Sequence, residues 1–283
     1  MPDNPNQHAA DHLRTHDPIW HASLQFVPED RRATVMALFA FLAEVARTRS
    51  MISEPMPGEI RLQWWRDAIG GIEHGAVGSN PLAAALLEAM GRDGLPAATL
   101  QAVLDGRTFD LYDDPMPETH TFEGYAGEVW SGPMALAMGY LASEPAGQFA
   151  DAAGHGGVAL TVARVLTGFH HWTARGQTLI PKPMLDEAGT TPDALRLGKQ
   201  TAGLSDALKA FIAYGQSHVH KAQEAARSLP SAAYPILLPV SLASRTFKEA
   251  EGWADDPFRG ALSHARWKLL WRVWRASKRM PRL

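Results

Sequence analysis

Apolar residues recur along most of this chain at the three- and four-residue spacing of amphipathic helices, and Pro/Gly clusters separate the helical stretches. Alternating runs of Val, Ile and Thr, which would indicate strands, are few. Pro28, followed by two acidic residues, has the chemistry of a helix start. The pattern predicts an all-α protein with helices over residues 29–50, 59–73, 81–91, 96–112, 121–142, 148–171, 201–228, 232–249 and 258–277.

Length and composition favour one large domain. The chain has 283 residues, 46% of them hydrophobic, and no linker long enough to separate two domains. The first 17 residues are polar, with three aspartates and one arginine, which fits neither a secretory signal nor a transit peptide. We therefore predict a flexible tail over residues 1–17 and a helical domain over residues 18–283. The sequence contains no run of about 18 apolar residues, so it predicts no membrane-spanning helix.

Cysteine content and charge restrict the expected cellular compartment and the expected class of partner. Cysteine is absent, which excludes disulfides and thiolate metal sites and favours a reducing, cytoplasmic compartment. The formal net charge is −3, yet seven basic residues and no acidic one lie between His264 and Leu283. An acidic body argues against a nucleic-acid partner, whereas the basic end suits a local anionic partner.

The basic end also carries an apolar stripe at helical spacing, formed by Trp267, Leu270, Trp271 and Trp274. Cationic residues, among them Arg272 and Arg275, flank this stripe. Two interpretations remain open. Either the stripe closes the helical core and the cations coat its outside, or the helix lies at an anionic membrane surface or against a partner.

Three segments together resemble the squalene/phytoene synthase family over about residues 18–275. They are Phe39–Ser50, the pair Leu104–Leu111 and Thr121–Met134, and the stretch from Gly157 through Pro181. The resemblance implies an isoprenoid-synthase-like fold, in which the helices of a single domain surround a central cavity. In the synthases, two aspartates on each of two facing helices bind magnesium, and magnesium holds a prenyl diphosphate.

The corresponding positions in this chain carry no carboxylate. Aligning the segments places Ala46 and Ser50 at the first motif and Gly168 and Trp172 at the second. None of these four can be an anionic magnesium ligand, so we expect no catalytic residue, no metal and no cofactor. We interpret Trp172 as a plug in the space of the ion. We expect magnesium as a cofactor only if the protein is an active enzyme.

Charged residues near the expected cavity are candidates for binding an anion or a phosphate: Arg47, Arg107, Asp110, Arg164, Arg175 and Lys182. Each has a simpler interpretation. Arg47, with Arg49, could point to solvent, and Arg107 with Asp110 could be an ordinary ion pair three residues apart. Arg175 and Lys182 could be helix-end charges. His170 and His171 point about 100° apart on a helix and do not suggest a metal site.

The aspartate-free pattern is similar to a non-synthase branch that contains a mitochondrial complex I assembly factor and bacterial relatives. That resemblance rests on Phe39–Arg47, Ser53-Glu54 and Arg61–Arg66. It implies a non-catalytic assembly or interaction factor with a protein partner in a respiratory complex, either cytoplasmic or peripheral on the inner membrane. Two alternatives stay open: an active squalene- or phytoene-forming prenyl transferase, and a metal-independent binder of a polyprenyl lipid.

Overall fold

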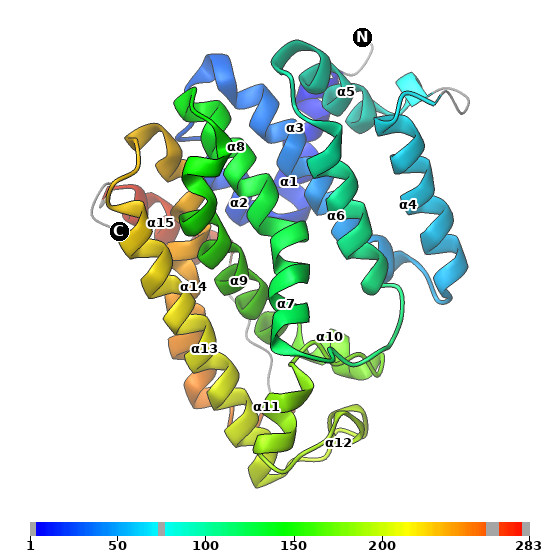
Figure 1. Ribbon diagram of the computed structural model, residues 1–283, viewed down its shortest axis with the longest axis vertical. Coiled ribbons are helices and arrows are strands. Elements are labelled where there is room, and N and C mark those ends of the chain that lie inside the picture. Colours follow the sequence, from blue (N-terminus) through cyan, green and yellow to red (C-terminus); the bar gives the residue numbers. More distant parts are fainter. Residues whose placement is uncertain (1–3, 73–76, 259–265, 279–283) are drawn as a thin grey trace.

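The computed structural model describes residues 4–72, 77–258 and 266–278, and within these ranges it contains helices and no strand (Figure 1). The all-α prediction is confirmed. The α-helices are α1 (Pro5–His16), α2 (Pro18–Leu24), α3 (Glu29–Ala46), α4 (Pro55–Ile69), α5 (Pro81–Asp93), α6 (Ala97–Phe109), α7 (Thr119–Ala126), α8 (Gly132–Ala142), α9 (Ala150–Thr167), α10 (Phe169–Ala174), α11 (Lys182–Glu187), α12 (Pro192–Arg196), α13 (Ala202–Ala226), α14 (Tyr234–Trp253) and α15 (Arg266–Ser277).

Helix α9 runs through the middle of the molecule and packs against α13, α14 and α8. Twelve of its eighteen residues are buried, and many of them are glycine or alanine. The small residues let neighbouring backbones approach. A Cβ on Gly157 would lie 2.2 Å from the Ser131 Oγ atom, so only glycine fits there. Ser131 ends a single π-helical turn, η3 (Gly127–Ser131), which joins α7 to α8.

The prediction of a flexible tail over residues 1–17 is wrong for the part that the structure describes. Helix α1 begins at Pro5, where the Asn4 side chain accepts a hydrogen bond from the Asn6 amide and caps the helix. Its buried side chains, Ala9 and Leu13, pack α1 against α3 and α5. Ala10, which is partly buried, also packs against the core. These few small or isolated apolar positions are too weak a pattern to stand out in a polar sequence.

Two predicted helices are shorter than expected at their motif ends. Helix α3 stops at Ala46 and gives way to the 3-10 turn η1 (Thr48–Met51), so it does not reach residue 50. Helix α9 stops at Thr167, and α10 begins at Phe169. Gly168 lies between them and is conformationally non-helical.

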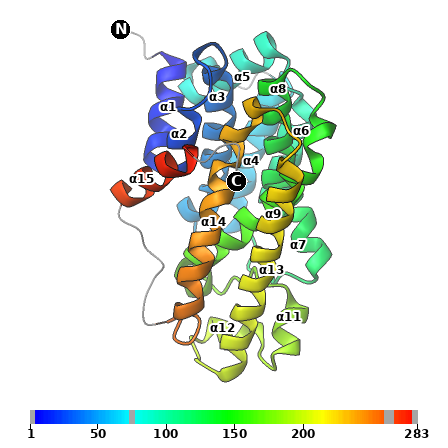
Figure 2. The same ribbon diagram turned by 90° about the vertical axis from the view of Figure 1, so that its left-hand side faces the viewer.

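Helix α15 lies across α2 and beside α14, as Figure 2 shows at the edge of the molecule. The predicted helix over 258–277 begins later, because α15 starts at Arg266, and residues 259–265 lie outside the described ranges. Among the described residues, no helix combines the length and the apolar composition needed to cross a membrane.

Candidate functional site

A layer of aromatic rings lies between α3 and α9. The Trp20 ring, from α2, stacks on Phe39 of α3 with 3.8 Å between centroids. Trp20 also lies nearly parallel to Trp130, at 6.1 Å and an angle of 9°. All three side chains are at most 2% exposed. Because Trp130 belongs to η3, the π-helical turn is what brings this ring into the centre.

Arg164 connects the aromatic layer to α9. Its guanidinium lies 4.3 Å from the Trp130 ring centroid, a cation–π distance. It also forms an ion pair with Asp17, the residue between α1 and α2. Asp17 caps α2 as well, since its carboxylate accepts a hydrogen bond from the Trp20 amide. The N-terminal segment is therefore fixed to α9 by charge and to α3 by ring stacking.

Two of the sequence candidates, Arg107 and Asp110, form a closed buried network with Tyr125. Arg107 donates to the Asp110 carboxylate and to the Tyr125 hydroxyl, each at 2.8 Å, and Tyr125 donates to the other Asp110 oxygen at 2.8 Å. Burial raises the pKa of Tyr125, although the Arg107 guanidinium opposes this shift, so the phenol keeps its proton. Both carboxylate oxygens of Asp110 are thus occupied within the chain.

A second charged cluster surrounds Glu44 on α3. The Glu44 side chain is 10% exposed and forms ion pairs with Arg61, from α4, and with Arg47 at 3.3 Å. His12 of α1 approaches within 3.3 Å. Burial lowers the pKa of His12 to about 4, although Glu44 raises it, so the imidazole is neutral at pH 7. Arg47 therefore neutralises a buried carboxylate.

The other charged candidates do not join these clusters. Lys182 is 53% exposed and pairs with Asp186 one turn along α11. Arg175 is half-buried at the end of α10. Arg49 is buried and pairs with Asp113 at 3.0 Å, so the interpretation that it points to solvent is wrong. In the part of the chain that the structure describes, no three His, Asp or Glu side chains are grouped so as to hold a metal ion.

Two exposed surfaces stand apart from the centre. On α15, Trp267, Trp271 and Trp274 are 67%, 50% and 52% exposed, while Val273, on the adjoining side that faces the protein, is 1% exposed. The interpretation that the tryptophan stripe closes the core is therefore wrong. The two arginines predicted to contact a membrane or a partner differ in exposure. Arg272 is half-buried and pairs with Glu249 at 3.1 Å, whereas Arg275 is exposed.

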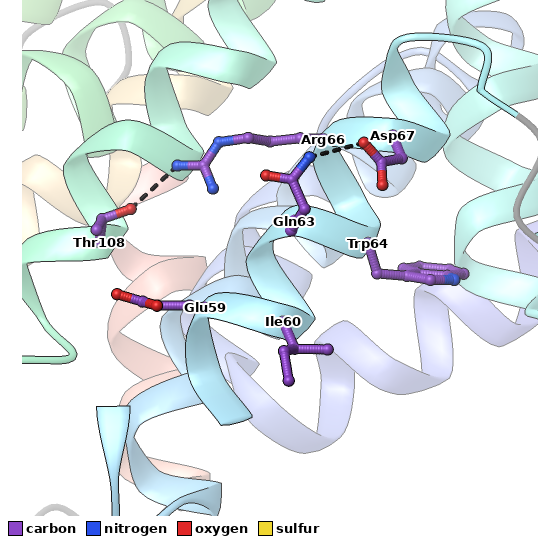
Figure 3. Close-up of a pocket in the computed structure, with 7 residues that line it drawn as sticks. All are labelled: Glu59, Ile60, Gln63, Trp64, Arg66, Asp67 and Thr108. Atoms are coloured by element: carbon purple, nitrogen blue, oxygen red, sulfur yellow. Dashed lines mark hydrogen bonds between the residues drawn. The ribbon is translucent and has the colours of Figure 1, made fainter. Parts of the chain in front are cut away.

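The second surface is a groove of about 600 Å³ along α4. Its floor carries both charge signs: Arg66 donates to Thr108 and Gln63 donates to Asp67, as Figure 3 shows. Ile60, which is 66% exposed, and the half-buried Trp64 add apolar area. This groove therefore combines polar groups of both signs with exposed apolar side chains, which is typical of protein interfaces.

Comparison with known proteins gives the family. The sequence profile of squalene/phytoene synthase matches residues 13–275. The chain belongs to the squalene/phytoene synthase family. Solved structures agree in fold: the squalene synthase of Alicyclobacillus acidocaldarius has a TM-score of 0.73 at 17% identity, covering 90% of this chain and 95% of that one. A dehydrosqualene synthase has a TM-score of 0.77 at 15% identity, covering 97% and 96%.

Relatives found by sequence carry a different name from the solved structures. "NADH dehydrogenase (ubiquinone) complex I, assembly factor 6" of Bos taurus is 24% identical over 251 residues, which are 88% of this chain and 75% of that protein. The human protein of the same name is 24% identical, over 80% of this chain and 68% of its own length. The Dictyostelium discoideum homologue is 26% identical, over 75% and 60%.

The four positions that the sequence assigns to the family's metal motifs lie on α3 (Ala46), on η1 (Ser50), directly after α9 (Gly168) and on α10 (Trp172). Ala46 is half-buried, and Ser50 is exposed with its hydroxyl donating to the Arg47 carbonyl at 2.7 Å. Gly168 and Trp172 fit each other: a Cβ on residue 168 would lie 2.5 Å from the Trp172 Nε1 atom. The Trp172 ring thus occupies the space beside the helix break, and a side chain at residue 168 would displace it.

Sequence reasoning missed the residues that fill the centre of this family member. His12, Asp17, Trp20, Tyr125 and Trp130 were not candidates, because three of them belong to a segment read as a tail or to its edge. Asp17 and Arg164 are 147 positions apart, and no local pattern links them. The Asp-Pro pair that opens α2 was the one usable signal, since it is a typical capping sequence.

Proposed function

We propose that this protein is a non-catalytic member of the squalene/phytoene synthase family that assists the assembly of a respiratory complex, as a peripheral protein of the inner membrane. One observation carries the proposal. Ala46, Ser50, Gly168 and Trp172 stand where the synthases need carboxylates, and the Trp20–Trp130 layer lies between the helices that bear them.

Electrostatics argues against prenyl transfer. A prenyl diphosphate has about three negative charges at neutral pH, and an apolar interior tolerates them only if cations offset them. The cations nearest the centre are already paired: Arg47 with Glu44, Arg107 with Asp110, and Arg164 with Asp17. A substrate would have to break these pairs without the help of metal ligands.

The names of the sequence relatives support the assembly role, because they describe assembly factors of NADH dehydrogenase. Helix α4 supports it as well. This helix carries the Arg61–Arg66 segment on which the assembly-factor resemblance partly rests, and its groove exposes Ile60 beside Trp64. We take the α4 groove as the contact for the protein partner.

Affinity purification tests the proposal. The tagged full-length protein, purified from detergent-solubilised membranes of its native cells, should retain subunits of the NADH-oxidising respiratory complex. Ile60→Glu should reduce their recovery at least tenfold, because a charge would enter an apolar contact. Met51→Glu, also at an exposed apolar position but outside the groove lining, is the matched control. Equal recovery with both variants would contradict the α4 contact, and recovery of no such subunit would contradict the assembly role.

The fold itself favours one alternative, an active synthase, because the solved structures with TM-scores of 0.73 and 0.77 are synthases. That alternative requires magnesium to be bound by residues other than the four motif positions. Turnover of labelled prenyl diphosphate in the presence of magnesium decides between the two functions.

A further inference from the structure

Helix α15 has two apolar faces of different kinds. One face carries Val273, which is 1% exposed, and the half-buried Leu269, and it packs on α2 and α14. The other face carries Trp267, Leu270, Trp271 and Trp274, which are between 41% and 67% exposed. Because the inner face already anchors the helix, the four outer side chains are not needed for packing. Single exposed apolar residues are common, but three tryptophans aligned on one helix face form a patch that requires a partner.

Cations accompany each exposed tryptophan. The Lys268 ammonium lies 5.6 Å from the Trp267 ring centroid, the Arg275 guanidinium 5.3 Å from Trp271, and the Lys278 ammonium 5.6 Å from Trp274. From His264 to the last residue the chain has no acidic side chain. Of the seven basic residues of this end, Arg279 and Arg282 lie outside the described residues. The outer face therefore presents aromatic rings and positive charge only.

The patch continues onto α2. A groove of about 320 Å³ separates the two helices, and its lining includes Leu270 and Trp274 from α15 and Phe26, which follows α2. Phe26 is 40% exposed. Arg14, at the end of α1, also lines the groove. The surface is thus wider than a single helix. Its α2 side also carries the polar residues His21 and Gln25, and Arg14 is paired with Asp11, so the cations available to a ligand are those of α15.

We propose that this face, which we call the α15 face (Phe26, Trp267, Leu270, Trp271 and Trp274 with Lys268, Arg275 and Lys278), binds the headgroup region of a bilayer that contains anionic phospholipid. Tryptophan prefers the boundary between headgroups and acyl chains, where its ring is apolar and its N–H stays hydrated. Cations beside the rings attract anionic headgroups, each contributing roughly 1 kcal/mol. A helix of this length, about 18 Å, lies flat on the surface rather than crossing it.

Charge favours a lipid surface over a protein partner. The α15 face combines exposed tryptophans with positive charge only, which is the pattern of helices that lie on anionic bilayers, whereas the α4 groove carries both charge signs. Arg272 supports the same orientation. It is half-buried and bonds to Glu249 of α14, so it fixes the helix from behind while the three outer cations remain available. The inference deepens the proposed membrane location and does not depend on the assembly role.

Sedimentation of the intact protein with lipid vesicles tests the inference. We expect binding to vesicles of phosphatidylcholine with about one third phosphatidylglycerol at low salt, weak binding to pure phosphatidylcholine, and loss of binding near 0.5 M salt, where charge is screened over about 4 Å. Reversing two charges (Arg275→Glu with Lys278→Glu) should weaken binding more than tenfold, given roughly fivefold per charge removed. Replacing Trp271 and Trp274 by alanine should weaken binding at least as much without lowering Tm.

Ile60→Ala, on the exposed face of α4, is the control and should bind vesicles like the parent protein. The inference is overturned if the parent protein ignores anionic vesicles at low salt, or if the double tryptophan variant sediments equally well. It is also overturned if the tryptophans instead hold two copies together, seen as a dimer in analytical ultracentrifugation that the double variant abolishes. If the protein does not bind vesicles but still retains respiratory-complex subunits, the proposed lipid binding is contradicted and the proposed assembly role is not.

Discussion

The same residue type is used in opposite ways at two places in this protein. At the centre, Trp20 and Trp130 are 1% and 2% exposed and stack within a layer that joins α3 to α9. On α15, Trp267, Trp271 and Trp274 are at least half exposed and lie beside cations. The buried rings contribute to the packing of the interior. The exposed rings on α15 leave an apolar surface, and the proposed contact with lipid rests on that surface. Tryptophan therefore serves stability in one region and is available for binding in the other.

Replacing one tryptophan from each region should give the largest contrast. Trp20→Ala would leave a void in a fully buried aromatic layer and should lower the free energy of unfolding by about 3–5 kcal/mol. Trp271→Ala removes an exposed ring and should change it by less than about 0.5 kcal/mol. Urea unfolding followed by circular dichroism measures both. Equal losses for the two variants would mean that the centre and α15 do not differ as described.

The network of Arg107, Asp110 and Tyr125 should be nearly as costly to break as the aromatic layer. Asp110→Ala leaves a buried guanidinium without its carboxylate and should lower stability by about 3–5 kcal/mol. Combining it with Arg107→Met should recover part of the loss, because the unpaired charge is then gone. If Asp110 instead served a ligand, Asp110→Ala would leave stability nearly unchanged, and the double variant would be no better than either single one.

The contact between Gly168 and Trp172 should give an intermediate effect. Gly168→Ala places a methyl group 2.5 Å from the Trp172 Nε1 atom and should cost about 1–3 kcal/mol. Trp172→Leu should relieve most of that cost, so a double-mutant cycle on these two positions should show strong coupling. Gly124→Ala, where a Cβ would meet no atom within 4 Å, is the control and should be neutral or slightly stabilising. Additive effects at positions 168 and 172 would rule out the plug.

Acid should destabilise the protein before its carboxylates titrate. Burial lowers the pKa of His12 to about 4, and burial together with His155 lowers that of His218 to about 4, from an ordinary value of 6.5. The unfolded chain therefore binds more protons than the folded one between pH 6.5 and 4, and stability falls as the pH drops through this window. Tm should decrease by on the order of 5 °C between pH 7 and pH 5.

The matched variant for this pH dependence is His218→Gln, which should flatten the decrease. Glu123 opposes the lowering of the His218 pKa, and Lys221 adds to it, so both stay in place in this comparison. An unchanged slope in His218→Gln would show that other groups control the acid sensitivity. Glu128, whose pKa burial raises, acts in the opposite direction, because the folded protein binds its proton more readily than the unfolded chain, and it offsets part of the loss at lower pH.

More of the α15 surface than of the buried centre could be predicted from the sequence. Periodicity located most helices, because long amphipathic stretches are a strong signal. The spacing of Trp267, Leu270, Trp271 and Trp274 identified one face of α15, but not its direction. A second apolar pair, Leu269 and Val273, lies directly beside this stripe on the same helix and is the pair that packs inward. Spacing groups residues by face and cannot say which face meets the core.

The centre was harder to predict than the surface. The sequence pointed to Arg107, Asp110 and Arg164, but their partners come from distant segments. Asp17 and Trp20 reach the centre only because α1 and α2 fold back onto α3. Contacts between residues so far apart in sequence depend on the assembled fold, and the polar first helix gave little sign that it would be part of it.

Turnover of radiolabelled prenyl diphosphate is the most direct test of the central claim. The full-length protein, with excess magnesium and either farnesyl or geranylgeranyl diphosphate, should form no squalene- or phytoene-like product, while an authentic squalene synthase in the same assay does. Ala46, Ser50, Gly168 and Trp172 offer no carboxylate for the metal, and the nearby arginines are already paired. Product at about one turnover per second, the rate of a slow but genuine enzyme, would contradict the account.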